Sequence, residues 1–584
     1  MNKEGGTFAD NDPQALLHDG IQAYQDGNLA EADATFRRVL KLDKNHADAN
    51  HLLGLVARQR GNNKVAVELI SRAIQINPYN ADYHNNLGNA MKDLRRIDEA
   101  VVSYRKAIAI LPSFSTAHSN LGSALRILGQ LQDGVTSIQM AIRLEPDMAS
   151  AHVNLGNIMK DMGRDEDAEA SYRSGLDFNP NNSDALTNLG SLLEEQNHLK
   201  EAMDYFRKAI TINPDCEITY GNMANALYKL GSLNEAEQAY RRALELDPEY
   251  KDPEFGLSLT LLSLGHLKEG WLRYEGRFNH VNAGCWEHNE IPKSVNRATT
   301  EFPQPQWDGS TLVEKRIILW GDQGLGDEVR YASIIPDLQK TGADVTIECD
   351  KRLTDIFSRS FPDATILAAP HGGAAKEPEQ FDYQCPLAGL ARFFRNDYES
   401  FANDGPGYLK ADPALITFWD KRLKDISARP KVGLSWSSFV AIPARTPYYA
   451  SIEELAPILN ISGVDFVNLQ NFECNEDIAE AKKRFGIEIY SWDDIDNRND
   501  LNGVAALTSC LDLVISYPGF SSELAGSLGV PTLCFVNHKD SFEELGSKDN
   551  IWYLNTHHIC KNRNEPWQPV FEEIAEITQS KFGL

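Results

Sequence analysis

The sequence predicts two architectures in series: an all-helical solenoid in the first half and an α/β region with two parallel-sheet lobes in the second. The first prediction rests on small residues and prolines that return every 34 residues. The second rests on short apolar runs that alternate with helical segments from about residue 315 onward. Two glycine-containing turns, each between a strand and a helix, add a third observation, because open α/β sheets bind ligands at such turns.

The helical half repeats without insertions. A small residue recurs with a bulky residue 16 positions later, and a proline follows every pair after the first. This is the tetratricopeptide period, in which two amphipathic helices touch at small residues and the proline ends the second helix. We expect seven repeats over residues 13–248 and a degenerate eighth through Tyr274 that caps the stack, with first helices on the concave wall. The recurring small residues are Gly20, Gly54, Gly88, Gly122, Gly156, Gly190 and Ala224, the prolines are Pro78, Pro112, Pro146, Pro180, Pro214 and Pro248, and the bulky residues are Phe36, Ile70, Tyr104, Ile138, Tyr172, Phe206 and Tyr240.

An asparagine recurs at one position of the first helices, off the face that packs on the partner helix. Three residues later on the same surface stands a second polar row of asparagine or serine. A primary amide donates and accepts, so a regular row of amides can bind the peptide groups of an extended guest chain. One such asparagine is more simply explained as solvated, but five in helix interiors, where asparagine is unfavourable, favour binding. The first row is Asn86, Asn120, Asn154, Asn188 and Asn222, and the asparagines of the second are Asn89, Asn157 and Asn225.

With this asparagine row, the first half resembles the tetratricopeptide array of the protein O-linked N-acetylglucosaminyltransferases. The resemblance implies that the row holds an acceptor polypeptide. It does not by itself imply catalysis, because many tetratricopeptide proteins are adaptors.

Composition limits the partners. The chain has 584 residues and a formal net charge of -27, which argues against a nucleic acid or an anionic membrane as partner. The polar N-terminal tail, residues 1–12, lacks the apolar core of a signal peptide, and no apolar run is long enough to span a bilayer, so we expect a cytoplasmic protein. The eight cysteines are scattered, which suggests neither a disulfide framework nor a zinc site.

The periodicity changes after the repeat superhelix, residues 13–278. A proline-containing connector covers residues 279–311, a first lobe residues 312–428, and a second lobe with a C-terminal helix residues 429–584. The expected strands include residues 315–320, 344–349, 431–436, 465–470, 512–516 and 532–536, and the expected helices include residues 452–459, 475–485 and 521–528. Alternating strands and helices predict two Rossmann-like lobes around a cleft.

Two turns in this region carry candidate chemistry. In the first lobe, Gly324 and Gly326 precede Asp327 at a helix start, where the carboxylate either caps the helix or takes a proton from an attacking hydroxyl. In the second lobe, a turn with Gly519, Ser521 and Ser522 opens a helix whose amides can hold a phosphate, although the serines could simply cap it.

The order of these segments resembles the two-lobed glycosyltransferases of the GT-B architecture, in particular the heptosyltransferase-like regions that bacteria fuse behind tetratricopeptide repeats. Residues 321–327, 381–387, 432–436 and 512–531 carry the resemblance. It implies that Asp327 is the general base, that Gly519, Ser521 and Ser522 bind the phosphates of a nucleotide sugar, and that Gln470 and Asn471 recognise its base and ribose. It also implies an inverting enzyme that needs no cofactor and no metal.

A cation should offset the leaving phosphate. Arg445 is the candidate after the first strand of the second lobe, near Ser437 and Ser438, and the alternative is a solvated surface arginine. The acidic cluster Asp493, Asp494 and Asp496 is interpreted as a solvated loop. The second-lobe turn departs from relatives, which have an aspartate and a small hydroxyl residue in the turn and a histidine in the helix, where this chain has Pro518, Gly519 and Glu523.

The sequence therefore predicts a protein O-glycosyltransferase: the repeats capture an acceptor protein, and the lobes transfer a sugar from a nucleotide-sugar donor to its serine or threonine. The resemblance makes flagellin a plausible client. The chain could also form oligomers through its repeats. Two alternatives remain. One is a non-catalytic adaptor with degenerate lobes, which the altered turn favours. The other is a heptosyltransferase-like enzyme acting on a saccharide, against which the long asparagine row argues.

Overall fold

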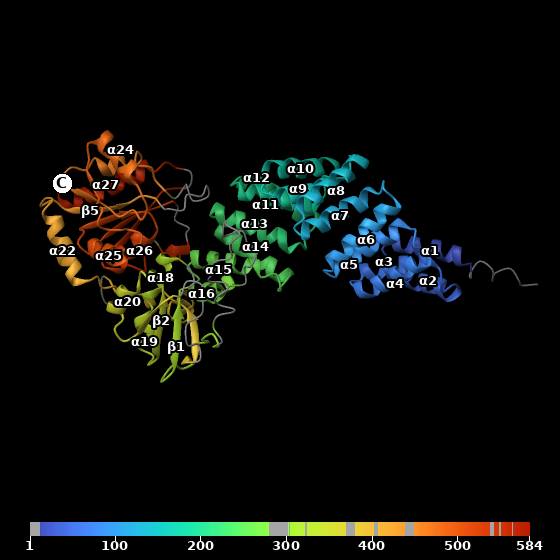
Figure 1. Cartoon of the computed structure of the whole chain (residues 1–584), viewed down its shortest axis with the longest axis horizontal. Helices are drawn as coiled ribbons and strands as arrows, with labels where there is room; N and C mark the ends of the chain where they lie inside the picture. Colours follow the sequence, from blue (N-terminus) through green and yellow to red (C-terminus); the bar gives the residue numbers. More distant parts are fainter. Residues whose placement is uncertain are drawn as a thin grey trace, which may run out of the picture. The chain divides into compact units, whose positions relative to one another are not determined.

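The computed structural model describes residues 12–278, 302, 304–321, 324–369, 380–401, 407–437, 449–537, 542–547, 550–562 and 565–584 (Figure 1). The chain forms two compact units, which divide between Ala226 and Leu227. The division falls inside the repeat array, ahead of its predicted end at residue 278.

The first unit is a helical tetratricopeptide solenoid. Its helices come in pairs: α1 (Pro13–Gln25) with α2 (Leu29–Leu42), α3 (Ala47–Gln59) with α4 (Asn63–Ile76), α5 (Ala81–Asp93) with α6 (Ile97–Ile110), α7 (Ser115–Ile127) with α8 (Leu131–Leu144), α9 (Ala149–Asp161) with α10 (Asp165–Phe178), and α11 (Ser183–Glu195) with α12 (Leu199–Ile212). Helix α13 (Glu217–Leu230) crosses the division.

The recurring small and bulky residues meet inside each pair. A Cβ placed on Gly88 would lie 2.5 Å from Cε1 of Tyr104, and one on Gly156 would lie 2.5 Å from Cε1 of Tyr172. Any larger residue at these glycines would overlap the ring, so the small residue sets the close approach of the two helices. The same overlap recurs at the pairs Gly20 and Phe36, Gly54 and Ile70, Gly122 and Ile138, and Gly190 and Phe206.

The second unit contains two parallel sheets. The first has the order β3 (Thr365–Ala368), β2 (Asp344–Cys349), β1 (Arg316–Trp320), β4 (Tyr383–Pro386). The second has the order β10 (Thr556–Cys560), β9 (Thr532–Val536), β8 (Leu513–Ser516), β5 (Lys431–Ser435), β6 (Asp465–Asn468), β7 (Ile489–Tyr490). Strand order reverses between β1 and β4 and between β5 and β8, so these are the two positions where such sheets bind ligands.

The helices of the two lobes follow their strands. The first lobe contains α18 (Leu325–Ala332), α19 (Ile335–Gln339), α20 (Thr354–Ser360) and α21 (Ala391–Phe394), and α22 (Pro413–Lys424) leads to the second. The second lobe contains α23 (Ala456–Leu459), α24 (Asn475–Phe485), α25 (Leu501–Ser509), α26 (Phe520–Ser527) and α27 (Gln568–Phe582). The helix expected at 452–459 starts only at Ala456, because Pro457 has no amide hydrogen for the turn before it.

The last repeat helices belong to the second unit. They are α14 (Leu233–Leu246), α15 (Asp252–Ser263) and α16 (Leu267–Tyr274). Trp271 of α16 is 2% exposed, and its ring packs edge-on against those of Tyr331 and Trp552, each with centroids 6.2 Å away. The degenerate eighth repeat, expected to cap the solenoid, is therefore buried against the α/β lobes.

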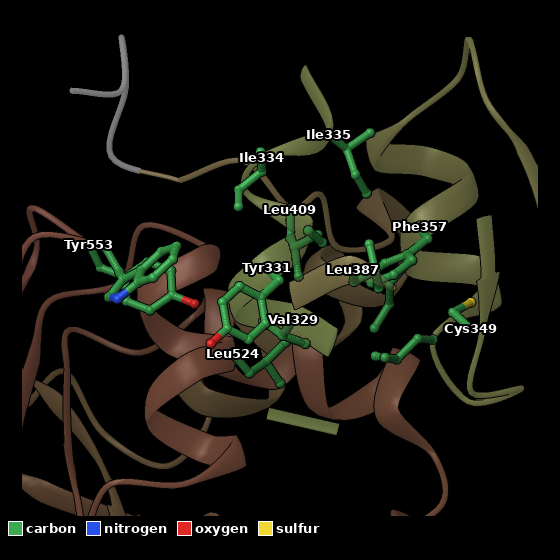
Figure 2. Close-up of a cluster of buried hydrophobic side chains, with 14 of the residues drawn as sticks. Val329, Tyr331, Ile334, Ile335, Cys349, Phe357, Leu387, Leu409, Leu524 and Tyr553 are labelled. Carbon is green, nitrogen blue, oxygen red and sulfur yellow. The ribbon is translucent and has the colours of Figure 1, made fainter. Parts of the chain in front are cut away.

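One apolar core joins these helices to both sheets. It includes Trp271, residues of α18 and α19, and residues of α25 and α26. Figure 2 shows Val329 and Tyr331 of α18 beside Leu524 of α26, with Tyr553 next to them. Because one core serves both lobes, the positions of α18 and α26 depend on each other.

We predict that Trp271→Ala lowers the free energy of unfolding of the second unit by about 3–5 kcal/mol, because truncating a buried tryptophan leaves a cavity. Chemical denaturation followed by fluorescence and circular dichroism measures this loss. Leu272→Ala is the matched control, since Leu272 is the neighbouring residue of the same helix and is 63% exposed. Equal effects of the two substitutions would contradict the packing described.

Candidate functional site

The candidate site lies where two helices begin at the carboxyl ends of central strands. β1 leads through Gly321 and Gly324 into α18, and β8 leads through residues 517–519 into α26. A Cβ placed on Gly326 would lie 3.5 Å from Cγ of Glu523 and 3.7 Å from the backbone nitrogen of Phe520. The amino ends of α18 and α26 therefore meet at Gly326.

The amino end of a helix is a place where proteins often bind anions. The first amides of a helix have no partner inside the helix, and the helix dipole places partial positive charge there. Two helix starts from different lobes face the same place, so a phosphate between them would be met by amides of both. The predicted phosphate turn and the predicted base are thus brought together by the fold.

Asp327 lies in the first turn of α18 and is half-buried. Its Oδ2 accepts a hydrogen bond of 3.2 Å from the backbone N–H of Gly324. The carboxylate thus caps α18, which fixes the side chain at the start of this helix. Asp322 and Gln323 lie outside the described residues.

The serines of the second-lobe turn are bonded within the protein. The Ser522 hydroxyl accepts from the N–H of Gly519 at 3.0 Å and donates to the carbonyl of Gly519 at 2.7 Å. Ser521 donates to the carbonyl of Leu469 at 3.2 Å, which ties α26 to the end of β6. The backbone amides of the turn, more than these hydroxyls, are the groups suited to a phosphate. Gly519 is required because a Cβ there would lie 2.6 Å from the Tyr517 ring.

Gln470 is buried and supports the end of β5. Its Oε1 accepts from the Ser435 hydroxyl at 2.8 Å and from the N–H of Trp436 at 3.0 Å, and its Nε2 donates to Ser437 at 3.1 Å. The residue is 1% exposed, and its side chain supports the strand end. Ser437 and Asn471 are half-buried at this edge. Ser438 and Arg445 lie outside the described residues.

The acidic loop after β7 is solvent-exposed at Asp493, Asp494 and Asp496, as expected, and it is also anchored to the rest of the second unit. Asp494 binds Arg422 at 2.7 Å, and this hydrogen bond lowers the pKa of Asp494. Asn497 donates to the carbonyls of Asn468 and Gln470, at 3.2 and 3.0 Å. The guanidinium of Arg352, from the first lobe, donates to the carbonyl of Arg498 at 3.0 Å.

This loop was not among the predicted site residues. The run of asparagines and aspartates around Arg498 was the available signal, because such side chains bind backbone groups in ordered turns. Arg498 is exposed on the anchored loop, which adds a cation near the end of β6.

A buried ion pair joins α18 to α26. Nη2 of Arg330 lies 2.5 Å from Oε1 of Glu523, and Nε lies 3.3 Å from Oε2. The Tyr553 hydroxyl donates to the same carboxylate at 2.7 Å, and burial raises the pKa of Tyr553, so the hydroxyl keeps its proton. The residue that departs from the family pattern, Glu523, is thus a structural link between the lobes.

The first asparagine row links neighbouring repeats. Nδ2 of Asn120 donates to Oδ1 of Asn85 at 2.9 Å, and Nδ2 of Asn154 donates to the Ser119 hydroxyl at 3.0 Å. Asn86 donates likewise to Nε2 of His51 at 2.9 Å, and Asn188 to Oδ1 of Asn157 at 2.9 Å.

These asparagines are half-buried, so they are neither freely solvated nor wholly available to a guest. Within residues 12–278, all of which are described, no residue donates a hydrogen bond to Oδ1 of Asn120, Asn154 or Asn188. Oδ1 is therefore the atom of each amide that a guest would meet. Asn222 is also half-buried, on α13.

The second row serves a different purpose. Oδ1 of Asn89 accepts from the Tyr104 hydroxyl and Oδ1 of Asn157 from the Tyr172 hydroxyl, both at 2.8 Å. Where the bulky residue is Ile138 or Phe206, the second row holds a serine. This correlation was visible in the sequence and identifies these asparagines as tyrosine partners. Asn225, which is half-buried, stands at the same spacing before Tyr240.

Among the described residues, no group of three or more His, Cys, Asp or Glu side chains is arranged to hold a metal ion. No helix in the described parts of the chain is long and apolar enough to cross a membrane.

We predict that His51 makes the repeat unit acid-sensitive. Burial lowers the pKa of His51 to about 4, against the effect of Asp82 and Asp48. The neutral ring is therefore favoured in the folded state, so its contribution is complete above about pH 6.5 and is lost as the pH falls toward 4, by about 3 kcal/mol in total.

Denaturation of the whole chain between pH 7.5 and 4 measures this loss. His51→Asn is the matched variant, since Asn85 occupies the equivalent position of the next repeat and accepts from Asn120 in the same way. Its stability should fall less over this pH range. An equal fall in both proteins would exclude His51 as the cause.

The comparisons with known proteins agree with the helical half. The family model of the cilia and flagella-associated protein 70 C-terminal domain matches residues 1–254. Protein FlbA of Caulobacter vibrioides is 31% identical over 322 residues, which is 53% of this chain and 51% of FlbA, so the chain spans about half the length of this curated relative.

Solved structures of other repeat proteins match part of the chain. PilF of Pseudomonas aeruginosa is 21% identical, and the match covers 36% of this chain and 95% of the PilF chain, with a TM-score of 0.32. A thermophilic tetratricopeptide protein from Thermus thermophilus is 23% identical over 31% of this chain and 99% of its own, with a TM-score of 0.29. Together with the helix pairs, the family match identifies the N-terminal region as a tetratricopeptide-repeat solenoid.

Proposed function

We propose that the protein is a protein O-glycosyltransferase, with a GT-B arrangement of its two lobes. The observation that carries the proposal is the meeting of two helix starts, α18 and α26, at the strand-order reversals of two parallel sheets. Such a place suits the phosphates of a nucleotide sugar, because amides and dipoles from both lobes converge on it. The donor is a substrate, and the reaction needs neither a metal nor a cofactor.

Asp327 is the proposed general base. It stands in the first turn of α18, beside the proposed phosphate site, and its capping bond to Gly324 holds it there. It would take the proton of a serine or threonine hydroxyl as that oxygen attacks the anomeric carbon, which inverts the configuration. The helix starts, with Arg445, would stabilise the departing phosphate.

The solenoid would capture the acceptor protein, and flagellin is the client that the family resemblance implies. Oδ1 of Asn120, Asn154 and Asn188 would accept hydrogen bonds from peptide N–H groups of an extended guest. Their Nδ2 atoms are already bonded to neighbouring repeats, so each amide is held in place before the guest arrives. Such preorganisation reduces the entropy lost on binding.

A protein-binding adaptor is the second candidate. The observation that favours it is the use of the predicted ligand groups by the fold itself: Asp327 and Ser522 cap helices, and Gln470 is buried. An adaptor would bind acceptor proteins without binding nucleotide sugars. A thermal-shift panel of UDP-, GDP- and CMP-linked sugars distinguishes the two, because a ligand of the native state raises its stability.

We predict that Asp327→Asn lowers sugar transfer by about a hundredfold to ten-thousandfold, since the general base is lost. Asparagine can still cap α18 through its carbonyl oxygen, so the fold and donor binding should persist. Intact-mass analysis of the acceptor measures transfer. Asp412→Asn is the control, because Asp412 caps α22 with bonds to Ala414 and Leu415. An Asp327→Asn variant as active as this control would exclude Asp327 as the base.

We predict that replacing Asn120, Asn154 and Asn188 together with alanine weakens acceptor binding about a hundredfold, at about 1 kcal/mol per lost hydrogen bond. Stability should change little, because alanine's helix propensity partly offsets the lost links between repeats. Calorimetric titration measures affinity, and circular dichroism follows folding.

The control for the triple variant is Thr187→Val. It removes a buried hydrogen bond of 2.7 Å that joins neighbouring repeats, between Thr187 and Thr219, and leaves every asparagine of the row in place. Acceptor affinity should be unaffected. If the triple variant binds the acceptor as tightly as this control, the row only joins repeats.

A further inference from the structure

We propose that Arg330 and Glu523 are positioning residues, whose ion pair sets the spacing between the amino ends of α18 and α26. The proposal rests on the function proposed above, because it concerns the distance from the base to the phosphate turn. Neither residue needs to touch a substrate.

The pair is placed to control this spacing. Arg330 follows Asp327 by three residues on α18, and Glu523 follows Gly519 by four on α26, so each lies about one helical turn beyond a candidate site residue. The helices are rigid over one turn. A shift of the ion pair would therefore move Asp327 relative to Gly519 by a similar amount.

The contact is specific in geometry. Two guanidinium nitrogens face two carboxylate oxygens, at 2.5 and 3.3 Å, and the side chains are 8% and 10% exposed. A fork of this kind fixes orientation as well as distance. It also keeps both charges compensated where water is excluded, so neither side chain can swing away without leaving a buried charge.

Two tyrosines donate hydrogen bonds to residues at this contact. The Tyr553 hydroxyl donates to Oε2 of Glu523, the same oxygen that accepts from Nε of Arg330. The Tyr408 hydroxyl donates to the carbonyl of Val329 on α18, and the two phenol rings stack with centroids 6.5 Å apart. Burial raises the pKa of both phenols, so both remain donors at neutral pH. The network thus runs from α18 through α26 and back to α18.

Stability alone does not explain this arrangement. Apolar side chains of similar size often replace a buried ion pair without loss of stability, whereas they would not fix a direction. A positioning role predicts that changing the length of the pair impairs the reaction even where the protein stays folded. A merely structural role predicts loss of stability only.

The test compares two variants, each of which changes the length of one buried acidic side chain by one methylene group. Glu523→Asp shortens the acidic side chain of the ion pair between α18 and α26. Asp465→Glu changes a second buried pair, Lys431 with Asp465 at 2.9 Å, which lies at the amino ends of β5 and β6, away from the site. Both variants of the full chain are assayed with the UDP-, GDP- or CMP-linked sugar that the wild type uses.

We expect Glu523→Asp to lower kcat about tenfold to a hundredfold with a small change in the donor KM, because a misplacement of about 1 Å impairs the attack more than binding. Asp465→Glu should keep kcat within about threefold of the wild type. Amide exchange, followed by mass spectrometry, should become faster at residues 325–327 and 520–522 in Glu523→Asp only. An unchanged kcat and unchanged exchange in folded Glu523→Asp would overturn the proposal.

Two further outcomes separate this proposal from the proposed function. If the wild type neither binds nor transfers any of these sugars, the glycosyltransferase proposal fails, and the exchange data alone decide whether the pair sets the helix spacing. If Glu523→Asp does not fold, Arg330→Lys, which keeps the charge and loses the fork, takes its place with the same expected changes. An Arg330→Lys protein with wild-type kcat and exchange would overturn the proposal as well.

Discussion

The contact between α18 and α26 is the constraint on which the second unit depends. Each helix begins at the carboxyl end of a central strand of its own sheet, so their contact fixes one sheet against the other. The apolar core crosses the same boundary and extends to Trp271. The last repeat helices, the first lobe and the second lobe therefore share one hydrophobic core, and a site between the lobes inherits its geometry from all three.

A similar coupling operates in the solenoid. Four asparagines of the first row use their amino groups to join two repeats, which orients the carbonyl of the same amide; they are Asn86, Asn120, Asn154 and Asn188. The hydrogen bond that holds neighbouring repeats in register therefore also fixes the direction of the amide oxygen, which can accept a hydrogen bond. A row of serines could not do both equally well, because a hydroxyl rotates and an amide is planar.

Local patterns were sufficient to predict the helix pairs and several strands. β2, β9 and α24 occupy their predicted ranges, because alternation and apolar runs act over a few residues. The spacing of Gly88 and Tyr104 also indicated their contact. The burial of Gln470, the pairing of Arg330 with Glu523 and the burial of Trp271 could not be predicted in this way, since each depends on residues far away in the sequence. The bond of Asn89 to Tyr104 was partly predictable, because the second row holds an asparagine where the bulky residue of the repeat is a tyrosine.

The charges of Glu523 and Arg330 help to explain the altered second-lobe turn. The glycosyltransferases that the second half resembles in sequence have a histidine in the helix after this turn, whereas Glu523 puts a carboxylate one turn from the proposed phosphate site. An uncompensated carboxylate there would repel a phosphate, and low water content would strengthen the repulsion. Arg330 compensates that charge from the other lobe. Under the proposed function, a carboxylate at position 523 would therefore be compatible with a phosphate at the start of α26, because Arg330 of α18 neutralises its charge.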